Sequence, residues 1–211
     1  MILAVHGFLG QGSDWNFLRE AGFEVIAPDL FADRQRVAGW FGGLAPPPDV
    51  IVGYSMGGRL ALQVASRFKL AVIISAGITP PDPGRRARDD AWAARFESEE
   101  WSTLMRDWNA KEIFSGHDAH RQEKDYDRAA LAAALREWSP SVLHAPDLRK
   151  LETPVIWMAG DRDEKYVAEA ERAVALLPHA RLEVVSGAGH RVPFERPDAV
   201  VDLLRDALRQ R

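Results

Sequence analysis

Short apolar runs alternate with amphipathic stretches along most of this chain. Runs rich in Val, Ile, Leu and Ala predict buried strands, because strands that are covered on both faces are apolar throughout. Leu60, Val64 and Phe68 recur at four-residue spacing, and residues 197–211 also have helical periodicity. This alternation predicts an α/β protein, with a mostly parallel sheet of about six strands wrapped by helices. The predicted strands are 2–5, 24–27, 50–53, 70–75, 155–159 and 182–185.

One long segment interrupts this pattern. After the predicted strand at 70–75, strands give way to charged, helix-favouring sequence until the strand at 155–159. The segment Pro80-Pro81-Asp82-Pro83-Gly84 predicts a stiff, non-helical entry into this insertion. The expected organisation is a helical lid at 80–150 inserted into an α/β core at 1–79 and 151–211.

Ser55 is the clearest candidate for chemistry, in the sequence Gly53-Tyr54-Ser55-Met56-Gly57. The motif lies between a predicted strand and a predicted helix, which is the setting that a G-x-S-x-G nucleophile elbow requires. Its flanking residues must be small, because the turn strains the serine backbone and brings helix and strand close together. The motif therefore resembles the elbow of the α/β-hydrolases, although a serine here could instead cap the helix.

A glycine-flanked loop follows the first predicted strand. Its sequence is His6-Gly7-Phe8-Leu9-Gly10, and in α/β-hydrolases such a loop donates a backbone N–H to an oxyanion hole. We expect the two donors to be the amides of Phe8 and of Met56, the residue after the serine. His6 is expected to hold the loop rather than to act as the base.

An acid and a histidine follow the last two predicted strands. Asp161 and Asp163 come after the strand at 155–159, and His190 follows Gly187-Ala188-Gly189. The order serine, acid, histidine is the one that the α/β-hydrolase fold imposes on its catalytic triad. We predict Asp163 as the acid, with Asp161 as the alternative, and one of them could instead cap the helix expected to begin near Tyr166.

The composition narrows the classes of function. With 211 residues and a net charge of -4, the chain suits about one domain and lacks the basic character that nucleic-acid binding requires. The absence of cysteine excludes disulfides, thiol nucleophiles and cysteine-based metal sites. His117 and His120 have a spacing that suits a metal, but no partner at ligand spacing is evident. We therefore expect no metal and no cofactor.

The start of the chain and its hydropathy favour a cytoplasmic location. Met1 leads directly into a predicted strand, so no cleavable signal peptide is expected. No apolar run approaches the ~20 residues that span a membrane. The sequence does not indicate an oligomeric state.

A closer resemblance extends over the core and the expected lid. It is carried by residues 53–59, 85–96, 107–108, 145–148 and 160–163. These segments resemble the 2-succinyl-6-hydroxy-2,4-cyclohexadiene-1-carboxylate synthase family of α/β-hydrolases, although the usual N-terminal hairpin is missing. The resemblance implies a lyase of menaquinone biosynthesis that eliminates pyruvate from a carboxylated cyclohexene precursor. It also implies that Ser55 acts as a base and that His190, oriented by Asp163, accepts the charge.

The resemblance further implies how a small anionic substrate is bound. A guanidinium offers a carboxylate two parallel hydrogen bonds, which a lysine cannot. The position that matches the family's second lid arginine is occupied by Glu123, with Arg121 and Lys124 nearby. The residues that match the family's other substrate-binding positions are Tyr54, Arg59, Arg85 and Trp108, with Arg86 as the alternative to Arg85.

Two other readings use the same residues differently. A serine esterase or carbon–carbon bond hydrolase would form an acyl-enzyme on Ser55 and resolve it with water. A ligand receptor would leave the triad idle, because fold alone does not determine function.

Overall fold

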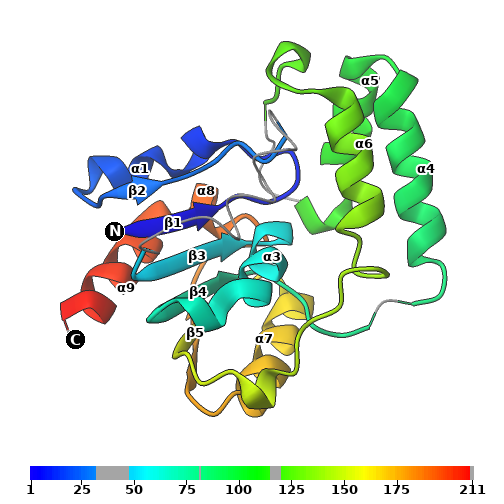
Figure 1. The fold of residues 1–211 in the computed structure, drawn as a ribbon. Coiled ribbons are helices and arrows are strands. Elements are labelled where there is room, and N and C mark those ends of the chain that lie inside the picture. Colours follow the sequence, from blue (N-terminus) through cyan, green and yellow to red (C-terminus); the bar gives the residue numbers. More distant parts are fainter. Residues whose placement is uncertain (32–47, 81, 115–119, 210–211) are drawn as a thin grey trace.

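A single six-stranded sheet forms the centre of the computed structural model, which describes residues 1–31, 48–80, 82–114 and 120–209. The strand order is β2-β1-β3-β4-β5-β6, and all neighbouring pairs are parallel (Figure 1). The expected sheet of about six strands is confirmed, and it is entirely parallel. The strands are β1 (Ile2–Val5), β2 (Val25–Ile26), β3 (Val50–Tyr54), β4 (Leu70–Ile74), β5 (Val155–Gly160) and β6 (Ala180–Val185).

The two edge strands differ most from the prediction. β2 has only two residues and pairs with β1 through Val25 and Ile26 alone. β6 begins at Ala180 rather than at residue 182, and within it Arg181 is exposed and Glu183 is half-buried. An edge strand such as β6 can carry polar side chains because one of its sides faces water, so hydrophobic patterning underestimates the length of β6.

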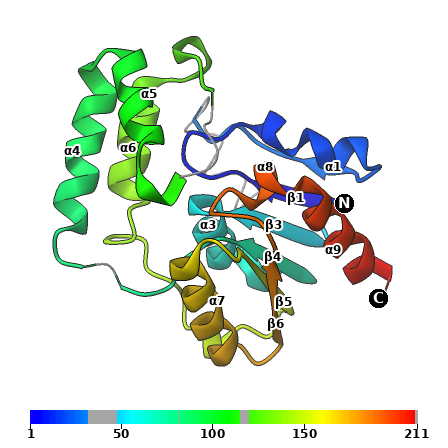
Figure 2. The same ribbon diagram turned by 180° about the vertical axis from the view of Figure 1, so that it is seen from behind.

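Helices cover both faces of the sheet. Alternate strand residues enter two apolar layers, with Leu3 and Ile51 in one and Ile2 and Val52 in the other. The views in Figures 1 and 2 place α3 and α7 on one face and α1, α8 and α9 on the other. These helices are α1 (Asn16–Glu20), α3 (Met56–Val64), α7 (Glu164–Leu176), α8 (Val192–Glu195) and α9 (Pro197–Arg209).

A separate group of helices lies beyond the carboxyl ends of the strands (Figure 2). This helical group consists of α4 (Arg85–Ser98), α5 (Trp101–Asn109) and α6 (Arg128–Glu137). It occupies the segment expected to form a lid at 80–150, and that division into domains stays a prediction. Pro81 of the expected entry and His117 lie outside the described residues. No helix in the described ranges is long and apolar enough to cross a membrane.

The first turn of α3 approaches β1 so closely that Gly57 has no room for a side chain. A Cβ added there would lie 2.3 Å from the carbonyl oxygen of Val5 and 2.4 Å from that of His6. Backbone atoms cannot yield as a flexible side chain can, so only glycine fits.

We therefore predict that Gly57→Ala lowers the free energy of unfolding by about 1–3 kcal/mol in urea titrations. This loss would occur although alanine favours helix by about 1 kcal/mol over glycine. Gly77→Ala is the matched control, since its Cβ would meet only the side chain of Glu169, at 3.3 Å. An equally stable or more stable Gly57→Ala protein would show that this approach is not a constraint.

Candidate active site

Ser55 lies in a strained turn between β3 and α3. Its φ of 52° and ψ of -115° are unusual for a residue with a side chain. The turn is held by the Ser55 N–H, which donates to the carbonyl oxygen of Ile74 at 2.8 Å. The Ser55 side chain makes no capping hydrogen bond to α3. The interpretation of Ser55 as a helix cap is therefore wrong, and the hydroxyl remains available to another partner.

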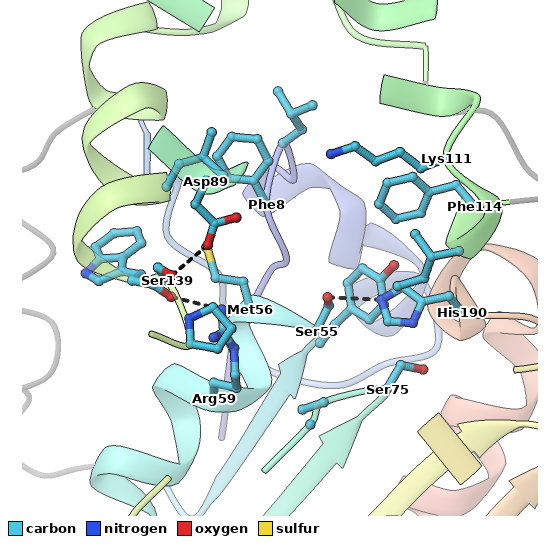
Figure 3. A pocket seen from close by; sticks show the side chains of 18 of the residues that line it. Phe8, Ser55, Met56, Arg59, Ser75, Asp89, Lys111, Phe114, Ser139 and His190 are labelled. Carbon is cyan, nitrogen blue, oxygen red and sulfur yellow. Dashed lines mark hydrogen bonds between the residues drawn. The ribbon is translucent and has the colours of Figure 1, made fainter. Parts of the chain in front are cut away.

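That partner is His190. Ser55 Oγ lies 3.1 Å from His190 Nε2, and His190 Nδ1 lies 2.7 Å from Asp163 Oδ2 (Figure 3 shows the first of these contacts). The His190 side chain is 1% exposed and that of Asp163 is 10% exposed. With its proton on Nδ1, the imidazole donates to Asp163 and leaves Nε2 free to accept the serine proton. The structure thus brings together the three predicted triad residues from three distant loops.

Asp161 has a different role. Its Oδ1 accepts the N–H of Gly187 at 2.9 Å, and this hydrogen bond lowers the pKa of the exposed Asp161 carboxyl. Asp163 occupies the N-cap position of α7 but makes no side-chain capping bond. Asp163 is thus the N-cap residue, as expected for one of the two acids, but its carboxylate contacts His190 and not the N–H groups of the helix.

The β1 loop lies beside the serine. Phe8 and Met56 both line the cavity above Ser55. No hydrogen-bond partner for the N–H of either residue occurs among the described parts of the chain. Two such amides beside a nucleophile are suited to stabilise a developing negative charge, as in an oxyanion hole.

His6 is buried beneath this loop. Its Nδ1 lies 2.7 Å from the carbonyl oxygen of Gly7, and its Nε2 accepts the N–H of Leu30 at 3.0 Å. Burial lowers the pKa of His6, which favours the neutral ring that this pattern requires. These contacts fit the expected role of His6 in holding the loop.

A cavity of about 560 Å³ opens above Ser55 between the sheet and the helical group. Arg86 is not among its lining residues; it is exposed and pairs with Asp90 at 3.0 Å. The predicted substrate-binding residues that do line the cavity are Tyr54, Arg59, Arg85 and Trp108.

Arg59 lines this cavity, and one of its guanidinium nitrogens is buried. Its Nη2 donates to the carbonyl oxygen of Trp138 at 2.9 Å, and its buried Nη1 has no partner among the described residues. Burial, and to a smaller degree Arg85, lower the pKa of Arg59 to about 10. A buried cationic donor without a partner is costly unless a ligand satisfies it.

Arg85 is already paired. Its Nε donates to both carboxylate oxygens of Asp89 at 2.8 Å, and the hydroxyl of Ser139 donates to Asp89 Oδ2 at 2.6 Å. The sequence analysis missed Asp89 and Ser139, which are 50 residues apart and meet only when α4 packs beside the end of α6. This pairing fixes the position of Arg85 at the cavity.

Three residues lie near the position that matches the family's second lid arginine, and they differ in whether they line the cavity. Arg121 lines the cavity and forms a bidentate pair with Asp14, at 2.9 and 2.8 Å. Glu123 pairs with Arg128 at 2.7 Å, and Lys124 is exposed and does not line the cavity. Arg121 is therefore the only one of Arg121, Glu123 and Lys124 that borders the cavity.

Two further cavity residues were also missed. The carboxylate of Glu169, on α7, accepts the N–H groups of Ile78 and Thr79 at 2.8 and 2.9 Å. Lys111 follows α5 and lies between two tryptophan rings. No local motif marks either residue, because their partners lie on other elements. In the described ranges, no group of three or more His, Asp or Glu side chains is arranged to hold a metal.

Comparisons with known proteins agree with this architecture. The Alpha/beta hydrolase family model matches residues 2–203. A 2-succinyl-6-hydroxy-2,4-cyclohexadiene-1-carboxylate synthase of Salmonella arizonae is 32% identical over 176 residues, which cover 75% of this chain and 68% of that protein. The structure of MenH from S. aureus has a TM-score of 0.86 at 22% identity, covering 100% of this chain and 94% of that one.

A thermophilic esterase from Thermogutta terrifontis, solved with malate bound, has a TM-score of 0.80 at 23% identity and covers 99% of this chain and 89% of that one. At this identity the likeness of the two solved structures concerns the fold, and it confirms the predicted α/β-hydrolase fold. The chain therefore belongs to the alpha/beta hydrolase family, and it is an enzyme related in sequence to the 2-succinyl-6-hydroxy-2,4-cyclohexadiene-1-carboxylate synthases.

Proposed function

We propose that this enzyme is a lyase of menaquinone biosynthesis that eliminates pyruvate from a carboxylated cyclohexene precursor. The observation that carries the proposal is the contact of Ser55 with His190 at 3.1 Å, beside a cavity that is also lined by Arg59. A proton-transferring serine and a buried cation are the two groups that such a substrate needs. The sequence relationship to the Salmonella synthase supports the same assignment.

In this mechanism Ser55 removes a proton from the ring. His190 Nε2 takes the proton of the Ser55 hydroxyl, and the alkoxide then breaks a ring carbon–hydrogen bond. The released electron pair moves through the ring and breaks the carbon–oxygen bond to the leaving group. Pyruvate departs as its enolate, which takes up the proton that His190 holds. One proton thus passes from ring to product, and no water is consumed.

Fixed donors stabilise the charges that the substrate brings and the reaction creates. The amides of Phe8 and Met56 would hold the oxygen on which negative charge develops. Arg59 would donate to a substrate carboxylate through its free Nη1, and Arg85, fixed by Asp89, would face the same anion. Where protein atoms replace water around these groups, the contacts are stronger than they would be in solution.

Ester or carbon–carbon bond hydrolysis is the second candidate. The same contact between Ser55 and His190 would activate the hydroxyl as a nucleophile. The similarity of the Thermogutta terrifontis esterase in fold favours keeping this reaction in view. Burst kinetics and covalent labelling of Ser55 by an organophosphate would accompany an acyl-enzyme, whereas the elimination needs no covalent intermediate.

Incubation with the cyclohexene precursor should release pyruvate, measured with lactate dehydrogenase and NADH. Ser55→Ala should abolish this release because the proton acceptor is lost. Ser66→Ala, at an exposed position after α3, should leave it unchanged. The proposal fails if the wild type releases no pyruvate, or if Ser55→Ala releases it at the wild-type rate.

The two neighbouring acids provide a second test. Asp163→Asn should lower kcat by about 10²–10⁴-fold, because an amide no longer stabilises the protonated imidazole or favours the proton on Nδ1. Asp161→Asn removes the same charge two positions away, where the carboxylate contacts Gly187, and should change kcat by less than about tenfold. Equal losses in the two variants would contradict the assignment of Asp163.

Arg59→Ala should weaken the binding of a carboxylated substrate more than that of a neutral one. We expect its KM to rise by an amount equivalent to about 1.5–3 kcal/mol, with a much smaller change for a neutral ester. Arg86→Ala is the matched control, because Arg86 is exposed and outside the cavity. Parallel losses on the charged and neutral substrates would indicate a structural role through the contact of Arg59 with Trp138.

A further inference from the structure

Several cationic side chains that line the cavity differ in whether a carboxylate is paired with them. Arg85, Arg88 and Arg121 each have a carboxylate partner within 3.0 Å. Within the described ranges, no carboxylate lies within salt-bridge distance of Lys111, although this half-buried residue also lines the cavity. Its charge is therefore not neutralised by the protein in the way that the charges of the three arginines are.

Lys111 is held in a defined place by two aromatic rings. Its Nζ lies 3.3 Å from the ring centroid of Trp108 and 3.7 Å from that of Trp92. The two rings are nearly perpendicular, at 89°, with their centroids 5.0 Å apart. Figure 3 shows Lys111 beside Phe114, above Ser55 and on the side of the cavity formed by the helical group.

The tryptophans orient the amine without supplying a counter-ion. An ammonium is attracted to the faces of both rings, yet they offer it no oxygen to accept its protons. Burial, with a smaller contribution from Arg85, lowers the pKa of Lys111 to about 7. The charged groups that act on it, Arg85, Asp89 and Arg95, all lie on α4, and Asp89 is shared with Arg85. An anion that entered the cavity would favour the charged form.

We propose that Lys111 is an anion-binding residue of the cavity, and that its ammonium group, held by Trp92 and Trp108, binds a carboxylate of the bound molecule. The inference rests on the proposed function for the identity of that molecule, an anion with several carboxylates. Arg59 and Lys111 would then bind separate carboxylates, since they lie on α3 and next to the helical group respectively.

This role has a pH dependence that packing alone does not produce. Anion binding requires the protonated amine, so affinity is full below the pKa of free Lys111, about 7, and falls as the pH rises through it. Carboxylates stay ionised throughout this range. If Lys111 only packed between the two tryptophan rings, the affinity for an anion would not depend on its protonation.

Succinate, a simple dicarboxylate, serves as the probe in isothermal titration calorimetry with the complete chain. At about pH 6.5, Lys111→Met should weaken succinate binding by about tenfold or more, because methionine keeps the stem and removes the charge. Lys124→Met is the matched control, since it removes the same charge from an exposed residue outside the cavity, and should bind as the wild type does.

The pH comparison does not depend on how Lys111→Met folds. Wild-type affinity should fall about tenfold between about pH 6.5 and about pH 8.5, whereas Lys111→Arg, which stays charged, should show a much smaller fall. Binding by Lys111→Met within twofold of the wild type, equal pH dependence in Lys111→Arg, or no succinate binding by the wild type would each overturn the proposal. If these binding results hold but no pyruvate is released from the precursor, the proposed function fails and the anion site remains.

Discussion

The close approach of α3 to the end of β1 is the constraint on which the site depends. A Cβ on Gly57 would lie 2.3 Å from a carbonyl oxygen of β1, and one on Gly53 would lie 2.5 Å from the Gly57 carbonyl oxygen. This packing holds Ser55 at a φ of 52°, a conformation that costs about 1–3 kcal/mol in a residue with a side chain. The same contact brings the β1 loop, with Phe8, beside Met56. Strain at the serine and placement of the two amides thus have one cause.

The cationic side chains of the cavity differ in whether the protein supplies a carboxylate partner for them, and this difference suggests different roles. Arg85 and Arg121 are held by Asp89 and Asp14, so the protein itself supplies a counter-charge to each. Among the described residues, Arg59 Nη1 has no hydrogen-bond partner, and the Lys111 amine lies on the faces of two tryptophan rings. In the proposed role an incoming anion would therefore contact Arg59 and Lys111, whereas the paired arginines fix the walls that position it. The net charge of -4 gives no sign of this local imbalance.

The sequence predicted the parts of the structure that local pattern determines. Buried parallel strands are apolar throughout, and the residues at their carboxyl ends meet at one edge of the sheet. The sequence alone therefore predicted that Ser55, Asp163 and His190 lie together. Contacts between helices that no motif encodes could not be predicted. Lys111 needs Trp92 from α4 as well as the nearby Trp108, and the contact of Asp89 with Ser139 needs α4 beside the end of α6.

The position of the helical group bears on which reaction the triad carries out. Because polar contacts tie this group to the core, the aromatic rings of Phe8, Trp108 and Phe114 form a defined wall at the cavity. Hydrolysis of an acyl-enzyme needs water at Ser55, whereas an elimination does not, so a wall of rings is compatible with the proposed elimination. The ties are Arg59 to the Trp138 carbonyl, Tyr126 to the Leu9 carbonyl, Arg121 to Asp14, and Arg191 to Asn109.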